Sequence, residues 1–291
     1  MPTSSSPSIH LGDGRRLAYA DLGDPEGAPV IWCHGGLSSR LDALPGREPA
    51  LAAGVRLIAP DRPGVGRSDR LENRTLLDWP RDVEALADSL RLDRFAVAGW
   101  SLGGAFAAAC AYALPDRVVA LGLVGSCIPG DWSGMRDEIN AMDRRFVQRA
   151  VSRPGSLRAT LTAMRLVARH APGAFLRSSR RGLTASARGP LEGDEGRWLP
   201  TAVTEGLRDP MGVVDEYRIM GAPWGFELAE IARPTYVWQG TDDSLVPAAW
   251  AGRLAAEIPG ASLIVVDGAG HFLPADHFDE ILRLVAAPPR D

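Results

Sequence analysis

A serine flanked by glycines is the first candidate for chemistry in this chain. The pattern Gly99 to Gly103 (GWSLG) follows an apolar run that ends at Ala98 and precedes small residues that suit a helix. A serine on such a strand-to-helix turn exposes its hydroxyl, and glycines on both sides avoid collisions with the strand and the helix. The pattern predicts that Ser101 is a nucleophile. Over these five residues alone, a glycine-rich turn that contains serine by chance would look the same.

A serine hydroxyl is a weak nucleophile near neutral pH and needs a base that is oriented by a carboxylate. The chain contains five histidines. His10 falls in an expected hairpin, His170 in an arginine-rich helix, and His277 inside the C-terminal helix. His34 opens a glycine loop and is better placed to shape that loop. His271 follows the last expected strand directly, so position and elimination favour it as the base.

The carboxylate is expected in the stretch GTDDSLVP, which follows a strand and precedes a helix. Asp243 is the preferred residue, because Asp242 is expected to hydrogen-bond the backbone of the turn. Asp131, which follows the strand Val118–Val124, is a second alternative. The chain order serine, aspartate, histidine is the order expected for this kind of turn.

Attack on a carbonyl also needs two N–H donors directed at the developing oxyanion. The first is expected from Leu102, at the start of the helix after the serine. The second is expected from Gly36 in the loop after an earlier strand, with Leu37 as the alternative. Glycine at position 36 allows the backbone to approach the substrate closely.

Strands alternate with helices over most of the chain, which predicts an α/β fold with a mostly parallel sheet that is covered on both faces. From Cys127 to Ile231 only helical spacing is present, for example from Met135 through Ile139 and Phe146 to Ala150. We therefore expect core residues 1–126 and 232–291, with 127–231 inserted over the sheet and 178–198 as a mobile loop. Five polar residues fall directly after expected strands, at the edge where function gathers in such sheets: His34, Asp61, Ser101, Asp243 and His271.

The composition is that of a globular protein, with 291 residues, 45% hydrophobic residues and a net charge of −4. This charge favours neither a nucleic acid nor an anionic membrane as a partner. Met1 to Ser8 has neither a basic start nor an apolar core, and no run reaches about 18 apolar residues, so we expect a cytoplasmic protein. The cysteines, which are expected to be buried free thiols, are Cys33, Cys110 and Cys127.

Taken together, these motifs resemble the α/β-hydrolase fold superfamily over nearly the whole chain. The residues that carry the resemblance are His34-Gly35-Gly36, Asp61 to Ser68, Gly99 to Gly104, Gly240 to Asp243, and Gly270-His271. The resemblance implies an eight-stranded sheet, a helical lid from about Cys127 to Ile231, and a pocket between lid and core. It also implies that Asp61 to Ser68 braces loops and takes no part in catalysis.

We expect a serine hydrolase that needs no metal or cofactor. The resemblance says little about the substrate, but an apolar, aromatic cleft would suit an ester, lactone or thioester of a medium-sized, mostly hydrophobic molecule. Serine at position 101 excludes the dehalogenase and epoxide hydrolase patterns, which have aspartate there. Trp100, Trp132 and Trp224 are expected to line an apolar pocket. Alternatives are C–C, lyase, elimination or cyclisation chemistry with the same triad, a proline iminopeptidase, or a non-catalytic binding protein. The partner is a small molecule, and the protein is expected to be a monomer or homodimer.

Overall fold

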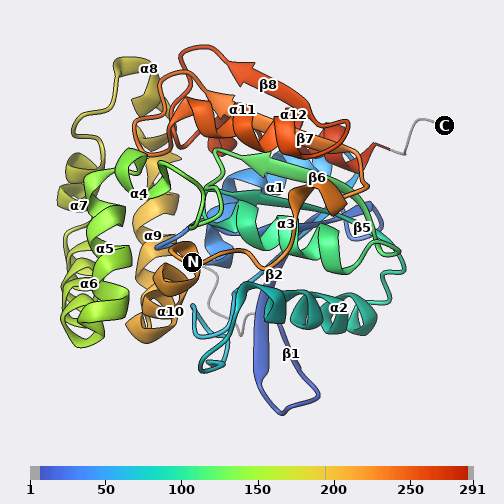
Figure 1. Cartoon of the computed structure of the whole chain (residues 1–291), viewed down its shortest axis with the longest axis horizontal. Coiled ribbons are helices and arrows are strands. Elements are labelled where there is room, and N and C mark those ends of the chain that lie inside the picture. Colours follow the sequence, from blue (N-terminus) through green and yellow to red (C-terminus); the bar gives the residue numbers. More distant parts are fainter. Residues whose placement is uncertain (1–6, 194, 288–291) are drawn as a thin grey trace.

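The computed structural model describes residues 7–193 and 195–287. Met1 to Ser6, on which the expectation about a signal peptide mostly rests, lie outside the described residues. Eight strands form one sheet in the order β1-β2-β4-β3-β5-β6-β7-β8 (Figure 1). β2 is antiparallel to β1 and β4, and the other neighbouring pairs are parallel. The predicted fold class is therefore confirmed. The strands are β1 (Ser8–His10), β2 (Arg16–Gly23), β3 (Ala28–Cys33), β4 (Val55–Pro60), β5 (Phe95–Trp100), β6 (Val118–Val124), β7 (Thr235–Gly240) and β8 (Ser262–Val266).

Helices cover both faces of this sheet. On one face α1 packs against α12, and on the other α2 packs against α3, while α11 contacts β7 and β8. Burial follows the position of a strand in the sheet: all residues of the central strand β5 are buried, whereas all five residues of the edge strand β8 are partly or fully exposed. The core helices are α1 (Arg47–Ala52), α2 (Trp79–Ser89), α3 (Gly103–Ala113), α11 (Ala248–Glu257) and α12 (Pro274–Ala286).

The segment from Cys127 to Ile231, here called the helical segment, contains no strand among its described residues. Its α9 packs against the 3-10 helix η1 (Arg40–Gly46) of the core, and α10 packs against α5 and α6. Figure 1 shows α5, α6 and α7 farther from the sheet, with α9 and α10 between. Its helices are α4 (Met135–Glu138), α5 (Ala141–Ser152), α6 (Pro154–His170), α7 (Pro172–Ser179), α8 (Ala185–Arg188), α9 (Trp198–Gly206) and α10 (Pro210–Met220).

Two local expectations for this segment are wrong. The helical spacing through residues 135–150 is divided into α4 and α5, because Ile139 is extended and the side chain of Asn140 caps α5 by accepting the N–H of Met142. The expected loop at 178–198 contains α8 and two 3-10 helices in its described part. Thr184 starts α8, since its hydroxyl accepts the N–H of Ala187 at 3.2 Å.

The three cysteines are buried and unbridged, as predicted. Within residues 7–193 and 195–287, every helix is too short or too polar to cross a lipid bilayer.

The crossing of α3 over β3 gives a test of the fold. A Cβ atom on Gly103 would lie 2.1 Å from the carbonyl oxygen of Cys33, so a side chain must push the helix away from the strand. We expect Gly103→Ala to lower the free energy of unfolding by about 1–3 kcal/mol, measured by urea denaturation. Gly12→Ala is the matched control, because nothing lies within 4 Å of its Cβ position, and it should change stability by less than about 0.5 kcal/mol. Equal stability of the two variants would contradict the close crossing.

Candidate active site

Ser101 lies on the turn between β5 and α3 with a φ angle of 55°. This left-handed conformation costs a non-glycine residue roughly 1–2 kcal/mol, so the surrounding backbone must hold it. The N–H of Ser101 donates to the carbonyl of Val124 at 2.8 Å, and its own carbonyl accepts from Gly104 at 3.1 Å. A Cβ atom on Gly99 would lie 2.2 Å from the carbonyl oxygen of Gly103, so the flanking glycine is a steric requirement of the turn.

His271 and Asp243 form a hydrogen-bonded pair next to this turn. Nδ1 of His271 lies 2.8 Å from Oδ2 of Asp243, and both side chains are almost fully buried. The other carboxylate oxygen, Oδ1, accepts the N–H groups of Leu245 and Val246, each at 2.8 Å. Burial acts to raise the pKa of Asp243, but the charge of His271 and these hydrogen bonds outweigh it and lower the pKa below its usual value. The carboxylate therefore stays ionised and binds the imidazole through Nδ1 rather than Nε2.

The other two aspartates considered for this role lie elsewhere. The side chain of Asp242 accepts hydrogen bonds from the hydroxyls of Thr184 at 2.7 Å and Ser186 at 3.0 Å, in the helical segment. The expectation that Asp242 bonds the turn backbone is therefore wrong. Asp131 is exposed and lines a surface hollow together with Arg253 of α11.

Trp100 packs beneath the loop that carries His271. Its Nε1 donates to the carbonyl of His271 at 2.8 Å, and its ring lies 5.8 Å from that of Phe272 and 5.9 Å from that of Trp198. A Cβ atom on Gly35 would lie only 2.7 Å from the Trp100 ring, so the indole also contacts the loop after β3. Trp100 thus connects the loops that carry the serine, the histidine and the glycines.

The peptide between Gly35 and Gly36 has a defined orientation. The carbonyl of Gly35 accepts from Nδ1 of His34 at 2.8 Å and from Nη2 of Arg62 at 3.2 Å. Nε2 of His34 accepts the backbone N–H of Arg62 at 3.3 Å, which makes Nδ1 the protonated nitrogen. Because the peptide is trans, the N–H of Gly36 points away from Arg62, and the Cβ position of Gly36 lies 3.5 Å from Cβ of Leu102. The two expected oxyanion donors therefore belong to neighbouring residues.

Asp42 of η1 supports the same loop from the other side. Its Oδ2 accepts the N–H of Gly35 at 2.9 Å, and its Oδ1 accepts Nε1 of Trp32 at 3.0 Å. The side chain is buried, and burial raises the pKa of Asp42 to about 7 against the effect of these hydrogen bonds. The sequence reasoning missed this residue because nothing in its neighbourhood resembles a motif.

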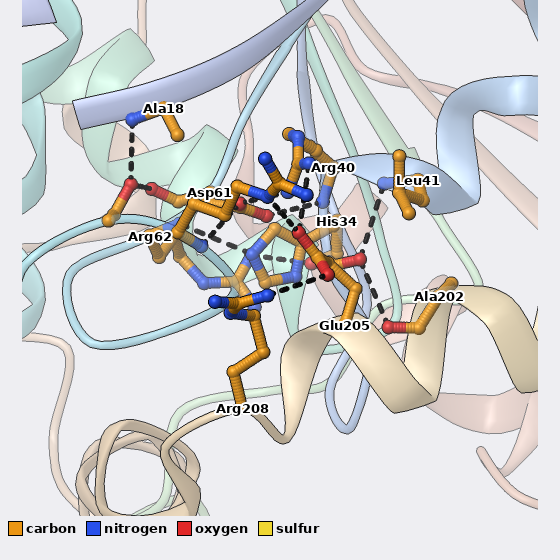
Figure 2. Close-up of polar contacts among 12 residues, drawn as sticks. Ala18, His34, Arg40, Leu41, Asp61, Arg62, Ala202, Glu205 and Arg208 are labelled. Carbon is orange, nitrogen blue, oxygen red and sulfur yellow. Dashed lines mark hydrogen bonds and ion pairs between the residues drawn. The ribbon is translucent and has the colours of Figure 1, made fainter. Parts of the chain in front are cut away.

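Buried ion pairs fasten the helical segment to this region (Figure 2). Arg40 donates to Asp61 at 2.5 Å and to Glu205 of α9 at 2.9 Å. Arg62 donates to Glu216 of α10 at 2.5 Å and also to the carbonyl of His34. The expected bracing role of the stretch that begins at Asp61 thus has a physical basis: its side chains join α9 and α10 to the loops around the serine.

A glycine contact fixes α10 at the same place. A Cβ atom on Gly212 would lie 2.0 Å from the carbonyl oxygen of Gly64, so the helix backbone rests directly on the loop after β4.

Among the described residues, the ring contacts of Trp132 and Trp224 do not involve Ser101, His271 or Asp243. Trp132 lies under the guanidinium of Arg253, 4.9 Å from ring centroid to Cζ. Trp224 packs against Phe226, which stacks on Tyr112 at the end of α3 far from the serine. The aromatic rings that pack against Trp100 are instead those of Trp198 and Phe272. Phe272 could have been found from its position next to His271 in the sequence.

Within the described ranges, no group of three or more His, Cys, Asp or Glu side chains is arranged to hold a metal ion.

Residues 28–278 match the family described as alpha/beta hydrolase fold, and the chain belongs to this family. It is 33% identical over 251 residues to a pimeloyl-[acyl-carrier protein] methyl ester esterase of Xanthomonas campestris pv. campestris, covering 82% of this chain and 88% of the relative. It is 29% identical over 310 residues to 2-hydroxy-6-oxononadienedioate/2-hydroxy-6-oxononatrienedioate hydrolase 2 of Pseudomonas putida, covering 97% and 95%.

Two further similarities are to a longer relative and to a solved structure. The chain is 29% identical to the dihydrolipoyllysine-residue acetyltransferase component of the acetoin cleaving system of Pseudomonas putida, but it spans only 66% of that protein. A thermophilic esterase from Thermogutta terrifontis superposes with a TM-score of 0.69 at 24% identity, covering 98% of this chain and 100% of the esterase. This structural similarity supports the shared fold.

The raised pKa of Asp42 predicts a pH dependence of stability. Between its ordinary value of 3.8 and about 7, the folded protein holds a proton on Asp42 that the unfolded chain releases. The stabilisation is therefore complete below the lower value and is lost as the pH rises through the upper one, with a slope of about 1.4 kcal/mol per pH unit. In urea titrations, the stability of the wild type relative to Asp42→Asn should fall by about 1–2 kcal/mol between pH 5 and 6.5. Parallel pH profiles of the two proteins would show that Asp42 does not titrate in this range.

Proposed function

We propose that this protein is a serine hydrolase that cleaves an ester, lactone or thioester of a medium-sized, mostly hydrophobic molecule. The observation that carries the proposal is the strained turn at Ser101 beside the hydrogen-bonded pair of His271 and Asp243. A left-handed serine at a strand-to-helix turn is costly to maintain, and such strain is characteristic of functional sites. Membership of a family whose relatives include an esterase and another hydrolase supports the reaction class.

In the proposed mechanism, the hydroxyl of Ser101 attacks the carbonyl carbon of the substrate. Nε2 of His271 takes the serine proton, because Nδ1 is engaged by Asp243, and then gives it to the leaving group. The N–H groups of Gly36 and Leu102 stabilise the negative charge on the substrate oxygen. Water, activated by the same imidazole, then hydrolyses the acyl-enzyme and restores the serine.

The aromatic side chains around His271 support a preference for apolar substrates. Trp100, Trp198 and Phe272 have mutual ring distances between 5.8 and 6.2 Å and form an apolar wall beside the histidine. Such walls with few polar groups suit hydrophobic small molecules. We therefore propose Trp198 and Phe272 as wall residues in place of Trp132 and Trp224.

The role of Ser101 can be tested with an active-site label. A fluorophosphonate should label the wild type on Ser101, and Ser101→Ala should abolish labelling and reduce turnover of a matched ester by at least about 10³-fold. Mass spectrometry of the labelled peptide and a panel of esters, lactones and thioesters of different chain length provide the measurements. If turnover survives in Ser101→Ala and is lost in His271→Ala, the histidine acts as a base without a serine nucleophile, and the acyl-enzyme proposal is wrong.

The role of Asp243 can be separated from that of the other candidate carboxylate. Asp243→Asn should lower kcat by about 10²- to 10⁴-fold, because the amide no longer stabilises the protonated imidazole in its required orientation. Asp131→Asn is the matched control, since Asp131 is exposed and should leave kcat nearly unchanged. A loss of activity in the control with a near wild-type rate in Asp243→Asn would reverse the assignment.

A further inference from the structure

Positive charge is concentrated in one part of the helical segment. Residues 141–191, which contain α5 to α8, include eleven arginines and a single acidic residue, Asp143. The stretch thus carries a formal charge of +10, whereas the rest of the chain carries −14. A globular protein with a net charge of −4 therefore presents a strongly basic region on its outer helices.

Two adjoining hollows gather part of this charge at α7. The larger, of about 750 Å³, lies between α6, α7 and α9, and the smaller, of about 390 Å³, lies between α7 and α8. Arg177 and Arg180 line both of them. We call the two together the arginine hollow, and its lining arginines from α6 to α8 are Arg169, Arg177, Arg180, Arg181 and Arg188.

None of these five arginines forms an ion pair with a carboxylate in the part of the chain that the structure describes. The side chain of Arg180 donates to the backbone carbonyl of Leu176, and that of Arg188 donates to the carbonyl of Leu183. Glu205 lines the larger hollow, but its carboxylate is already bound by two arginines of the core. Glu192, in the wall of the smaller hollow, is exposed.

Several guanidinium groups around one hollow repel each other, and an anion between them removes this repulsion. A guanidinium forms paired, charge-assisted hydrogen bonds with phosphate oxygens, and a volume of this size accommodates a small organic molecule. The side chain of Thr204 on α9 lines the same hollow and offers a further hydroxyl donor. We propose that the arginine hollow binds the phosphate groups of a small organic di- or triphosphate.

The position of the hollow relates this ligand to the candidate active site. A third hollow, of about 550 Å³, shares Arg197 and Thr201 with the larger one and is lined by Trp198. The ring of Trp198 lies 5.9 Å from that of Trp100. The bound phosphates therefore lie along the side of α9 that continues to the wall of the catalytic centre.

Isothermal titration calorimetry with pyrophosphate at low salt tests the proposal directly, because it measures the Kd of the complex. The wild type should bind pyrophosphate. The double variant Arg177→Gln/Arg180→Gln should raise the Kd by about ten-fold or more, because two charge-assisted contacts are lost. The matched control is Arg145→Gln/Arg158→Gln, which removes the same charge from exposed positions of the basic region outside the hollow. Its Kd should stay within about two-fold of the wild type. Thermal unfolding checks that both variants are folded.

Each other outcome of this titration has a defined meaning. Absence of binding to the wild type would overturn the proposal. Equal weakening of binding in both double variants would also overturn it, because binding would then depend on diffuse surface charge. Succinate binding as tightly as pyrophosphate would overturn the assignment to phosphates, while ATP and coenzyme A as further probes distinguish nucleotide triphosphates from a phosphorylated thiol carrier. Ser101→Ala should bind pyrophosphate like the wild type, so this result does not depend on the proposed hydrolase activity.

Discussion

The buried guanidinium of Arg62 is the contact on which the arrangement of the candidate site depends. It pairs with Glu216 of α10, donates to the carbonyls of His34 and Gly35, and lies 4.3 Å above the ring of Phe106. A buried charge is tolerated only when its partners are present, and removing one partner of such a pair costs about 3–5 kcal/mol. The glycine loop and α10 therefore take their positions together. This coupling sets the direction of the Gly36 N–H as well as the place of the helical segment.

Trp100, which precedes the serine in the chain, has a comparable role. Its indole donates a hydrogen bond to the backbone of His271 and fills the space against Gly35. One rigid side chain thus fixes the distance between the loop that carries His271 and the loop that carries Gly35. Catalytic groups need to be held within a fraction of an ångström, and packing of this kind supplies that precision better than loop backbone alone. The candidate site is thus built from side chains that do not themselves react, arranged around Ser101, His271 and Asp243.

The sequence predicted the parts of this site that depend on local constraints. Glycines at fixed distances from Ser101, and polar residues directly after apolar strands, follow from the geometry of a parallel sheet and can be recognised without tertiary structure. The pairing of Arg62 with Glu216, 154 positions later, has no local signal, because it depends on how the helical segment packs. The same holds for Asp242, whose hydroxyl partners Thr184 and Ser186 lie at the start of α8, and for the packing of Trp198 against Trp100.

The contact between Gly64 and Gly212 limits how far α10 can move from the core. The backbone of α10 rests on the core without an intervening side chain, and separating the two would also expose the ion pairs beside it. Displacing this helix therefore costs free energy, whereas α5 to α7 lie farther out and make no glycine contact of this kind with the core among the described residues (Figure 1). We therefore expect α10 to keep its position on the core when the outer helices α5 to α7 shift.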